Sequence, residues 1–107
     1  MGKLRLSLDP TFKAIVRVPV PGRGADDVEF IFKGRDREGV KAFVESIPNR
    51  SDVDLIMDMA SGWDLDDPFD AEGVAKMVKL FIGSTRAVLD KYLEEVAQAK
   101  LGNSTRP

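Results

Sequence analysis

The hydrophobic period of the chain changes near Gly34, and this change constrains the fold more than any other feature of the sequence. Before Gly34, apolar residues recur at every second position, which is typical of strands with one buried face. After Gly34, apolar residues recur at every third or fourth position, which is typical of helices with one buried stripe. The sequence therefore predicts an α+β fold, in which a small antiparallel N-terminal β-sheet is followed by about four α-helices.

The predicted sheet consists of a hairpin and one further short strand. Segments 12–20 and 28–33 carry apolar residues at every second position, and the turn-forming segment 21–27 separates them, which indicates an antiparallel hairpin with a fairly long loop. Because Pro19 has no backbone N–H, its end of the strand should lie at a sheet edge or at a bulge. A third alternating set predicts the short strand before the Asp9-Pro10 turn: Leu4, Leu6 and Leu8.

Four amphipathic segments follow, each with an apolar stripe at helical spacing. The first helix should end at Ile47, because a residue before proline avoids helical geometry. Ser51, Asp70 and Ser84 precede the other three stripes, and their side-chain oxygens suit helix N-caps. The four predicted core stripes are Val40, Phe43, Val44 and Ile47; Val53, Ile56, Met57 and Ala60; Val74, Met77, Val78 and Phe81; and Val88, Leu89, Tyr92, Leu93 and Val96.

The length of the chain, 107 residues, is that of one domain with one core. The last helix should end near Leu101-Gly102, so we expect a single domain over residues 1–102 and a disordered tail over residues 103–107. No apolar run approaches the length of a membrane span, and residues 1–6 lack the apolar core of a signal peptide. These features predict a cytoplasmic protein with no membrane partner.

Cysteine and histidine are both absent from the chain. The first absence excludes disulfides, thiol nucleophiles and zinc–thiolate sites. The second excludes the usual general base, the commonest metal ligand and every catalytic pair that contains histidine. We therefore expect no enzyme activity, no catalytic residue and no cofactor.

Two loops invite ligand-binding interpretations, and both fail the relevant pattern. A calcium loop that began at Asp64 would need an oxygen ligand, a glycine and a glutamate where the chain has Pro68, Phe69 and Ala75. The Gly22-x-Gly24 segment lacks the third glycine of a dinucleotide fingerprint and precedes a strand rather than a helix. We therefore predict neither a metal site nor a cofactor-binding residue.

Acidic residues concentrate in the second half of the chain. Residues 1–50 carry 10 basic and 7 acidic side chains, whereas residues 51–107 carry 6 and 11. Residues 51–72 include eight carboxylates and no lysine or arginine. A nucleic-acid binder should show a basic face, so this distribution argues against a nucleic-acid partner. The simplest interpretation of the acidic segment is a solvated face that keeps the protein soluble.

Segment 62–69 contains the only tryptophan and should link two helices. Aromatic side chains in such a linker are expected to fasten it to the core, which leaves the surrounding carboxylates and a leucine for contact with another protein. The expected structural anchors are Trp63, Phe69 and Tyr92. The expected partner-binding residues are Asp64, Leu65, Asp66, Asp67 and Asp70.

Several loose motifs follow one another along the chain. They are Phe12-Lys13, Val18-Pro19-Val20-Pro21-Gly22, Phe30-Ile31-Phe32-Lys33, Gly62-Trp63-Asp64-Leu65-Asp66, Pro68-Phe69, Gly83, Tyr92-Leu93 and Ala99-Lys100-Leu101-Gly102-Asn103. In this order they resemble the tail assembly chaperones of long-tailed, siphovirus-type bacteriophages and prophages. The resemblance covers roughly residues 8 to 103, and the order of the motifs carries it.

This resemblance implies a non-enzymatic role in building a phage tail. Such chaperones bind the long, aggregation-prone tape-measure protein, keep it soluble and help bring the major tail (tube) protein onto it. They act in the cytoplasm of the host cell and are not expected in the mature virion. The resemblance leaves open whether the chain also forms a homo-oligomer.

Two other classes of function stay open from the residues alone. The first is a small acidic regulatory or antitoxin-like protein whose acidic segment mimics nucleic acid and blocks a basic partner. The second is a hydrolase that holds a divalent metal with Asp64, Asp66 or Asp67. Strongly salt-dependent binding would favour the first, and metal-dependent turnover would favour the second.

Overall fold

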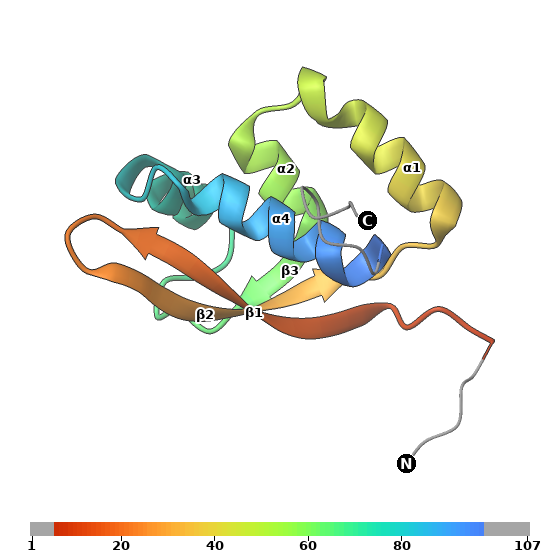
Figure 1. Ribbon diagram of the computed structural model, residues 1–107, viewed down its shortest axis with the longest axis horizontal. Coiled ribbons are helices and arrows are strands. Elements are labelled where there is room, and N and C mark those ends of the chain that lie inside the picture. Colours follow the sequence, from red (N-terminus) through yellow and green to blue (C-terminus); the bar gives the residue numbers. More distant parts are fainter. Residues whose placement is uncertain (1–5, 98–107) are drawn as a thin grey trace, which may run out of the picture.

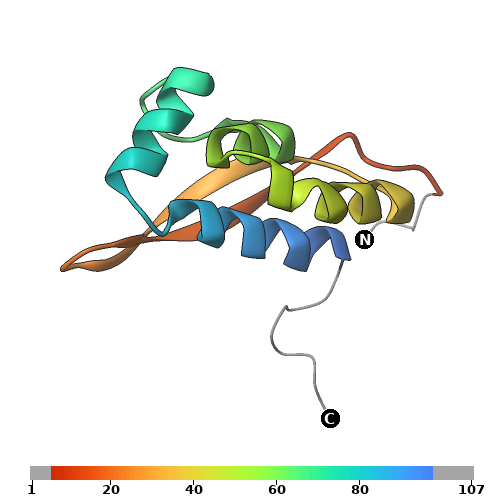
Figure 2. The same ribbon diagram turned by 90° about the horizontal axis from the view of Figure 1, so that it is seen from above.

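The structure, a computed structural model, describes residues 6–97 of the chain. Its elements are β1 (Thr11–Val20), β2 (Gly24–Lys33), α1 (Arg37–Ser46), the 3-10 turn η1 (Ile47–Asn49), α2 (Asp52–Met59), β3 (Ala60–Trp63), α3 (Ala71–Leu80) and α4 (Ser84–Ala97). The helices lie together over one face of the sheet, and the other face is open (Figure 1, Figure 2). The predicted α+β fold is confirmed.

The sheet is antiparallel, and its strand order is β1-β2-β3. β1 and β2 pair along their whole length, from Thr11 opposite Lys33 to Val20 opposite Gly24. β1 is therefore an edge strand, and Pro19 lies in it as predicted.

The third strand is not the one that the sequence predicted. Residues 6–10 form no strand, and the rest of the predicted N-terminal strand lies outside the described residues. The strand is instead β3, where the sequence predicted the end of a helix and the beginning of a linker. Ala60 already has extended backbone angles, and Trp63 pairs with Phe30 of β2. β3 is only four residues long, so the alternation of its apolar and polar residues is too short to be distinguished from the helical pattern that precedes it.

The hairpin loop is shorter than predicted. Arg23 N–H donates to the carbonyl of Val20 across 3.0 Å, with Pro21 and Gly22 between them. Gly22 has φ of +80°, so these four residues form a type II turn, with proline and glycine at their favoured positions. Because this turn needs so few residues, the strands continue through a segment that the sequence suggested was loop.

Three helices have side-chain N-caps. Asp36, Ser51 and Asp70 each accept a hydrogen bond from a backbone N–H three residues later, across 2.8, 3.1 and 2.8 Å respectively. The predicted caps at Ser51 and Asp70 are confirmed. The predicted cap at Ser84 is wrong: Ser84 is the first residue of α4, and its buried hydroxyl has no hydrogen-bond partner among the described residues. The turn before α4 is held instead by the backbone, through Ser84 N–H and the carbonyl of Phe81.

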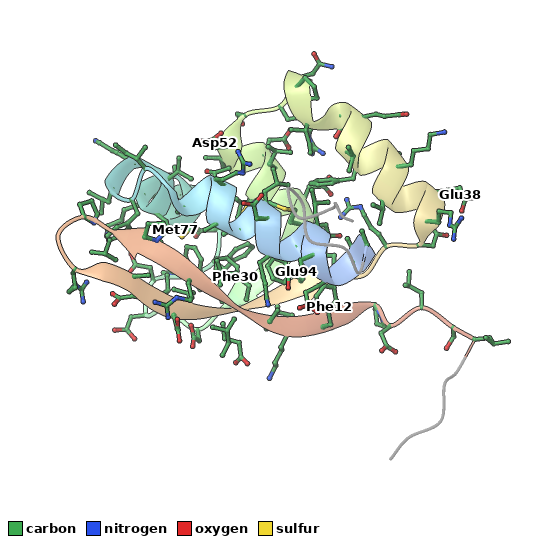
Figure 3. All side chains as sticks on the ribbon, in the orientation of Figure 1. Phe12, Phe30, Glu38, Asp52, Met77 and Glu94 are labelled. Atoms are coloured by element: carbon green, nitrogen blue, oxygen red, sulfur yellow. The ribbon has the colours of Figure 1, made fainter. Side chains whose placement is uncertain are left out.

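The core lies between the sheet and the helices, with Phe30 at its centre (Figure 3). The completely buried side chains include Val16, Phe30, Phe32, Ile56, Met59, Val74, Val88 and Tyr92. Two predicted stripes need correction. In α2 the buried stripe is rotated, so that Leu55 and Met59 are buried whereas Val53 and Met57 are only partly so. In α1 only Phe43 is fully buried, and Val44 is 42% exposed because none of the described elements covers that side of the helix.

No helix within residues 6–97 is long and apolar enough to cross a membrane. The predicted end of the last helix and the predicted tail over residues 103–107 lie outside the described residues.

Candidate functional site

Trp63 lies where the sheet meets the acidic linker, which we define as residues 64–70 between β3 and α3. Its indole N–H donates to the carbonyl of Asp67 across 2.7 Å. Its ring meets Phe69 edge to face at 5.0 Å and Phe30 at 6.0 Å between centroids. Trp63 therefore contacts the core on one side and the middle and C-terminal part of the linker on the other.

The carboxylates of the acidic linker have different hydrogen-bond and ion-pair partners. The backbone N–H of Glu29 donates to the carboxylate of Asp64 across 3.0 Å, and the backbone N–H of Asp64 donates to the carbonyl of Glu29 across 3.1 Å. These two bonds fix the linker to β2. Asp67 pairs with Lys76 at 3.1 Å. Asp70 caps α3. Asp66 is exposed and makes no ion pair with any residue of the described part of the chain. The predicted partner-binding residues thus lie together, but several of them also hold the fold.

Two adjoining hollows lie between the hairpin and α3, and we call them together the hairpin–α3 groove. One has a volume of about 140 Å³ and lies between the linker and α3; the other has a volume of about 380 Å³ and lies over the inner face of the hairpin. Both are lined by Leu65, Met77 and Phe81. Figure 3 shows Met77 at the end of the molecule where α3 approaches the hairpin turn. The predicted partner-binding Leu65 is therefore shared by both hollows.

Large apolar side chains are exposed at this end of the molecule. Leu65 is 40% exposed, Leu80 is 57% exposed, and Ile82, directly after Phe81, is 90% exposed. Exposed apolar clusters of this kind mark interaction surfaces. The surface thus combines apolar side chains with the carboxylates of the acidic linker.

A polar network at the other end of the sheet was missed by the sequence analysis. Tyr92 of α4 donates its hydroxyl to the carbonyl of Lys33 and accepts from Arg35, each across 2.7 Å. Arg35 also pairs with Asp58 of α2 at 2.8 Å, and the second oxygen of that carboxylate accepts from Arg50 at 2.6 Å. The network joins β2, α2 and α4 through groups that are largely shielded from solvent.

The network changes the ionisation of its members. Burial opposes the charge on Asp58, but hydrogen bonds from Arg50 and Arg35 outweigh this effect and lower the pKa of its carboxyl group. Burial raises the pKa of the Tyr92 hydroxyl, which therefore stays protonated and able to donate. Both shifts favour the protonation states in which every hydrogen bond of the network is made.

One signal in the sequence could have revealed this network. Asp54 and Asp58 are four residues apart on one helix, which places two like charges on the same face at a cost. Arg50 lies four residues before Asp54, and it pairs with both carboxylates. The spacing of these three residues therefore points to a charge cluster, although not to its contact with Arg35.

The described residues contain no group of three carboxylates placed so that they could hold a metal ion. The arrangement places exposed apolar side chains beside carboxylates on one surface. A family model described as phage tail assembly chaperone matches residues 1–103. The chain belongs to the phage tail assembly chaperone family. No curated protein and no solved structure matches it.

The family match confirms the resemblance to phage tail assembly chaperones that was inferred from the order of the motifs. It spans the hairpin, the acidic linker and all the described helices of this tail assembly chaperone. Members of this family are generally not enzymes. In this tail assembly chaperone, the acidic linker and the hairpin–α3 groove form the candidate site.

Proposed function

We propose that this tail assembly chaperone binds the tape-measure protein in the host cytoplasm, keeps it soluble and helps to recruit the major tail (tube) protein. We further propose that it does so without catalysis. The observation that most supports this function is the surface at which exposed apolar side chains and the carboxylates of the acidic linker meet, in a chain of this family.

The chemistry of this surface suits a chaperone for a long, aggregation-prone chain. Apolar side chains such as Leu65 and Leu80 can cover an apolar face that would otherwise associate with other copies of the partner. The carboxylates of the acidic linker attract basic segments and repel acidic ones, which speeds encounter and limits the choice of partner. Among these carboxylates, Asp66 and Asp67 are the most suitable for a test, because neither side chain caps a helix or bonds to a strand.

The test is co-expression with the tape-measure protein of the same phage. Reversing both Asp66→Lys and Asp67→Lys should sharply reduce the soluble tape-measure protein that is recovered with the chaperone. The fold should survive, because the ion pair that is lost is exposed and worth about 0–1 kcal/mol. The readout is the soluble fraction and the pull-down yield, beside a melting curve for each variant.

A matched control reverses two exposed carboxylates of α1, Glu38→Lys and Glu45→Lys, which changes the net charge by the same amount. This control should capture the tape-measure protein as the parent does. If both double variants recover equally little soluble tape-measure protein, the loss comes from the change in net charge and not from the acidic linker. Tape-measure protein that stays equally soluble without the chaperone would contradict the proposed function.

A further inference from the structure

We propose that the hairpin–α3 groove binds one amphipathic helical segment of a partner protein, whose apolar stripe is flanked by lysine or arginine. This inference rests on the proposed function, because the tape-measure protein is the expected source of the segment. It adds the place of binding, the conformation of the bound segment and the sign of its charge.

The lining of the groove supplies the apolar contacts. Its floor includes Val18 and Val28 of the hairpin and Met77 of α3, all buried, and its rim includes the exposed Leu65 and Leu80. Because Leu65 lines both hollows, the hollows adjoin and can receive two apolar side chains of one ligand. Residues four apart on a helix are about 5–6 Å apart, so a helix can present two such side chains on successive turns.

The backbone around the groove favours a helix over an extended segment. β1 and β2 pair with each other along their whole length, including the part that lines the groove. A ligand that lies over this inner face therefore meets side chains, and it does not lie along the edge of β2 that the described strands leave unpaired at residues 24–28, beyond β3. An extended ligand would bury its own N–H and C=O groups among apolar side chains, which is costly, whereas a helix satisfies these groups internally.

The charges around the groove determine which helix fits. Asp26 and Asp27 line it from the hairpin, where Arg23 and Arg17 pair with them at exposed positions, and Asp67 lines it from the acidic linker. Residues 64–72 carry five carboxylates and no lysine or arginine, and Lys76 pairs with only one of these carboxylates. A helix with basic residues beside its apolar stripe would meet complementary charge, whereas an acidic helix would be repelled.

The only tryptophan of the chain provides the readout, because Trp63 lines the smaller hollow. The probe is a synthetic peptide of about 20 residues without aromatic residues, long enough to form a helix, with leucines at i, i+3, i+4 and i+7 and lysines elsewhere. It should change the fluorescence of Trp63 saturably. A peptide of the same composition in scrambled order, and one with glutamate in place of lysine, should each bind about tenfold more weakly or worse.

Two matched variants locate the binding site. Leu80→Glu places a charge at the rim of the groove and should weaken binding about tenfold or more, and the exposure of Leu80 lets the variant fold. Val44→Glu introduces the same charge in place of another exposed aliphatic side chain, on α1, and should leave binding unchanged. Equal binding by both variants, or by the ordered and scrambled peptides, would overturn the proposal.

Two further outcomes separate this inference from the proposed function. If the peptide does not bind, but co-expression still keeps the tape-measure protein soluble, the groove is wrong and the proposed function stands. If Leu80→Glu instead breaks up a dimer detected by sedimentation, the occupant of the groove is a second copy of this chain, and the proposal of a basic helix is overturned.

Discussion

Replacing Tyr92 by alanine is expected to lower the free energy of unfolding by about 3–5 kcal/mol, the usual cost of removing a large buried aromatic side chain. Tyr92 is completely buried. Its ring lies 5.3 Å from that of Phe32 and 5.6 Å from that of Phe43, measured between centroids. The truncation would therefore open a cavity where β2, α1 and α4 meet. Urea denaturation followed by circular dichroism measures the loss.

Tyr92→Phe is the matched control, because it keeps the ring and removes only the hydroxyl group. The change leaves Arg35 and the carbonyl of Lys33 without this partner, which should cost about 1–3 kcal/mol. A loss as large as that of Tyr92→Ala would contradict the account, since it would assign the whole effect to the hydrogen bonds and none to ring packing.

Trp63→Ala is expected to lower the free energy of unfolding by about 3 kcal/mol, at the low end of the range for a large aromatic side chain because Trp63 is only partly buried. The substitution removes the edge-to-face contacts with Phe30 and Phe69 and the hydrogen bond to Asp67, so β3 and the acidic linker lose their common contact. The measurement is a denaturation curve beside the co-expression pull-down. Trp63→Phe is the control, because it keeps a ring in place and should lose markedly less stability.

Trp63 also lines the groove, so the pull-down separates two roles for this side chain. If Trp63 is chiefly structural, Trp63→Ala should lose stability, and its folded fraction should still capture the tape-measure protein. A variant that melts like the parent but no longer captures this protein would contradict the prediction, because Trp63 would then be a surface hot spot.

The sequence was a good guide to elements whose signal is local. The hairpin, the four helices and the caps at Ser51 and Asp70 are present as predicted, because alternation, helical spacing and cap chemistry are properties of short segments. The predicted strand at Leu6 and Leu8 is absent. Alternation alone does not form a strand, and residues 6–10 do not pair with β1 although the outer edge of that strand is open.

The candidate site was only partly predictable. The acidic linker stood out by composition, and its residues lie together at one end of the molecule. The groove did not stand out, because it joins Val18, Leu65 and Met77, which are far apart in the chain. The ion pair between Arg35 and Asp58 was missed for the same reason, since its partners are 23 residues apart. Contacts of this kind depend on how the elements pack against one another, and the pattern of a single segment does not predict that packing.

The most direct test of the account is hydrogen–deuterium exchange of the chaperone alone and in complex with the tape-measure protein. Binding to the proposed surface should slow exchange in residues 64–82 and in residues 18–28 of the hairpin. Exchange in α1, at the other end of the molecule (Figure 1), should be unchanged. Protection confined to α1 or to the outer edge of β1, with none in residues 64–82, would contradict the account.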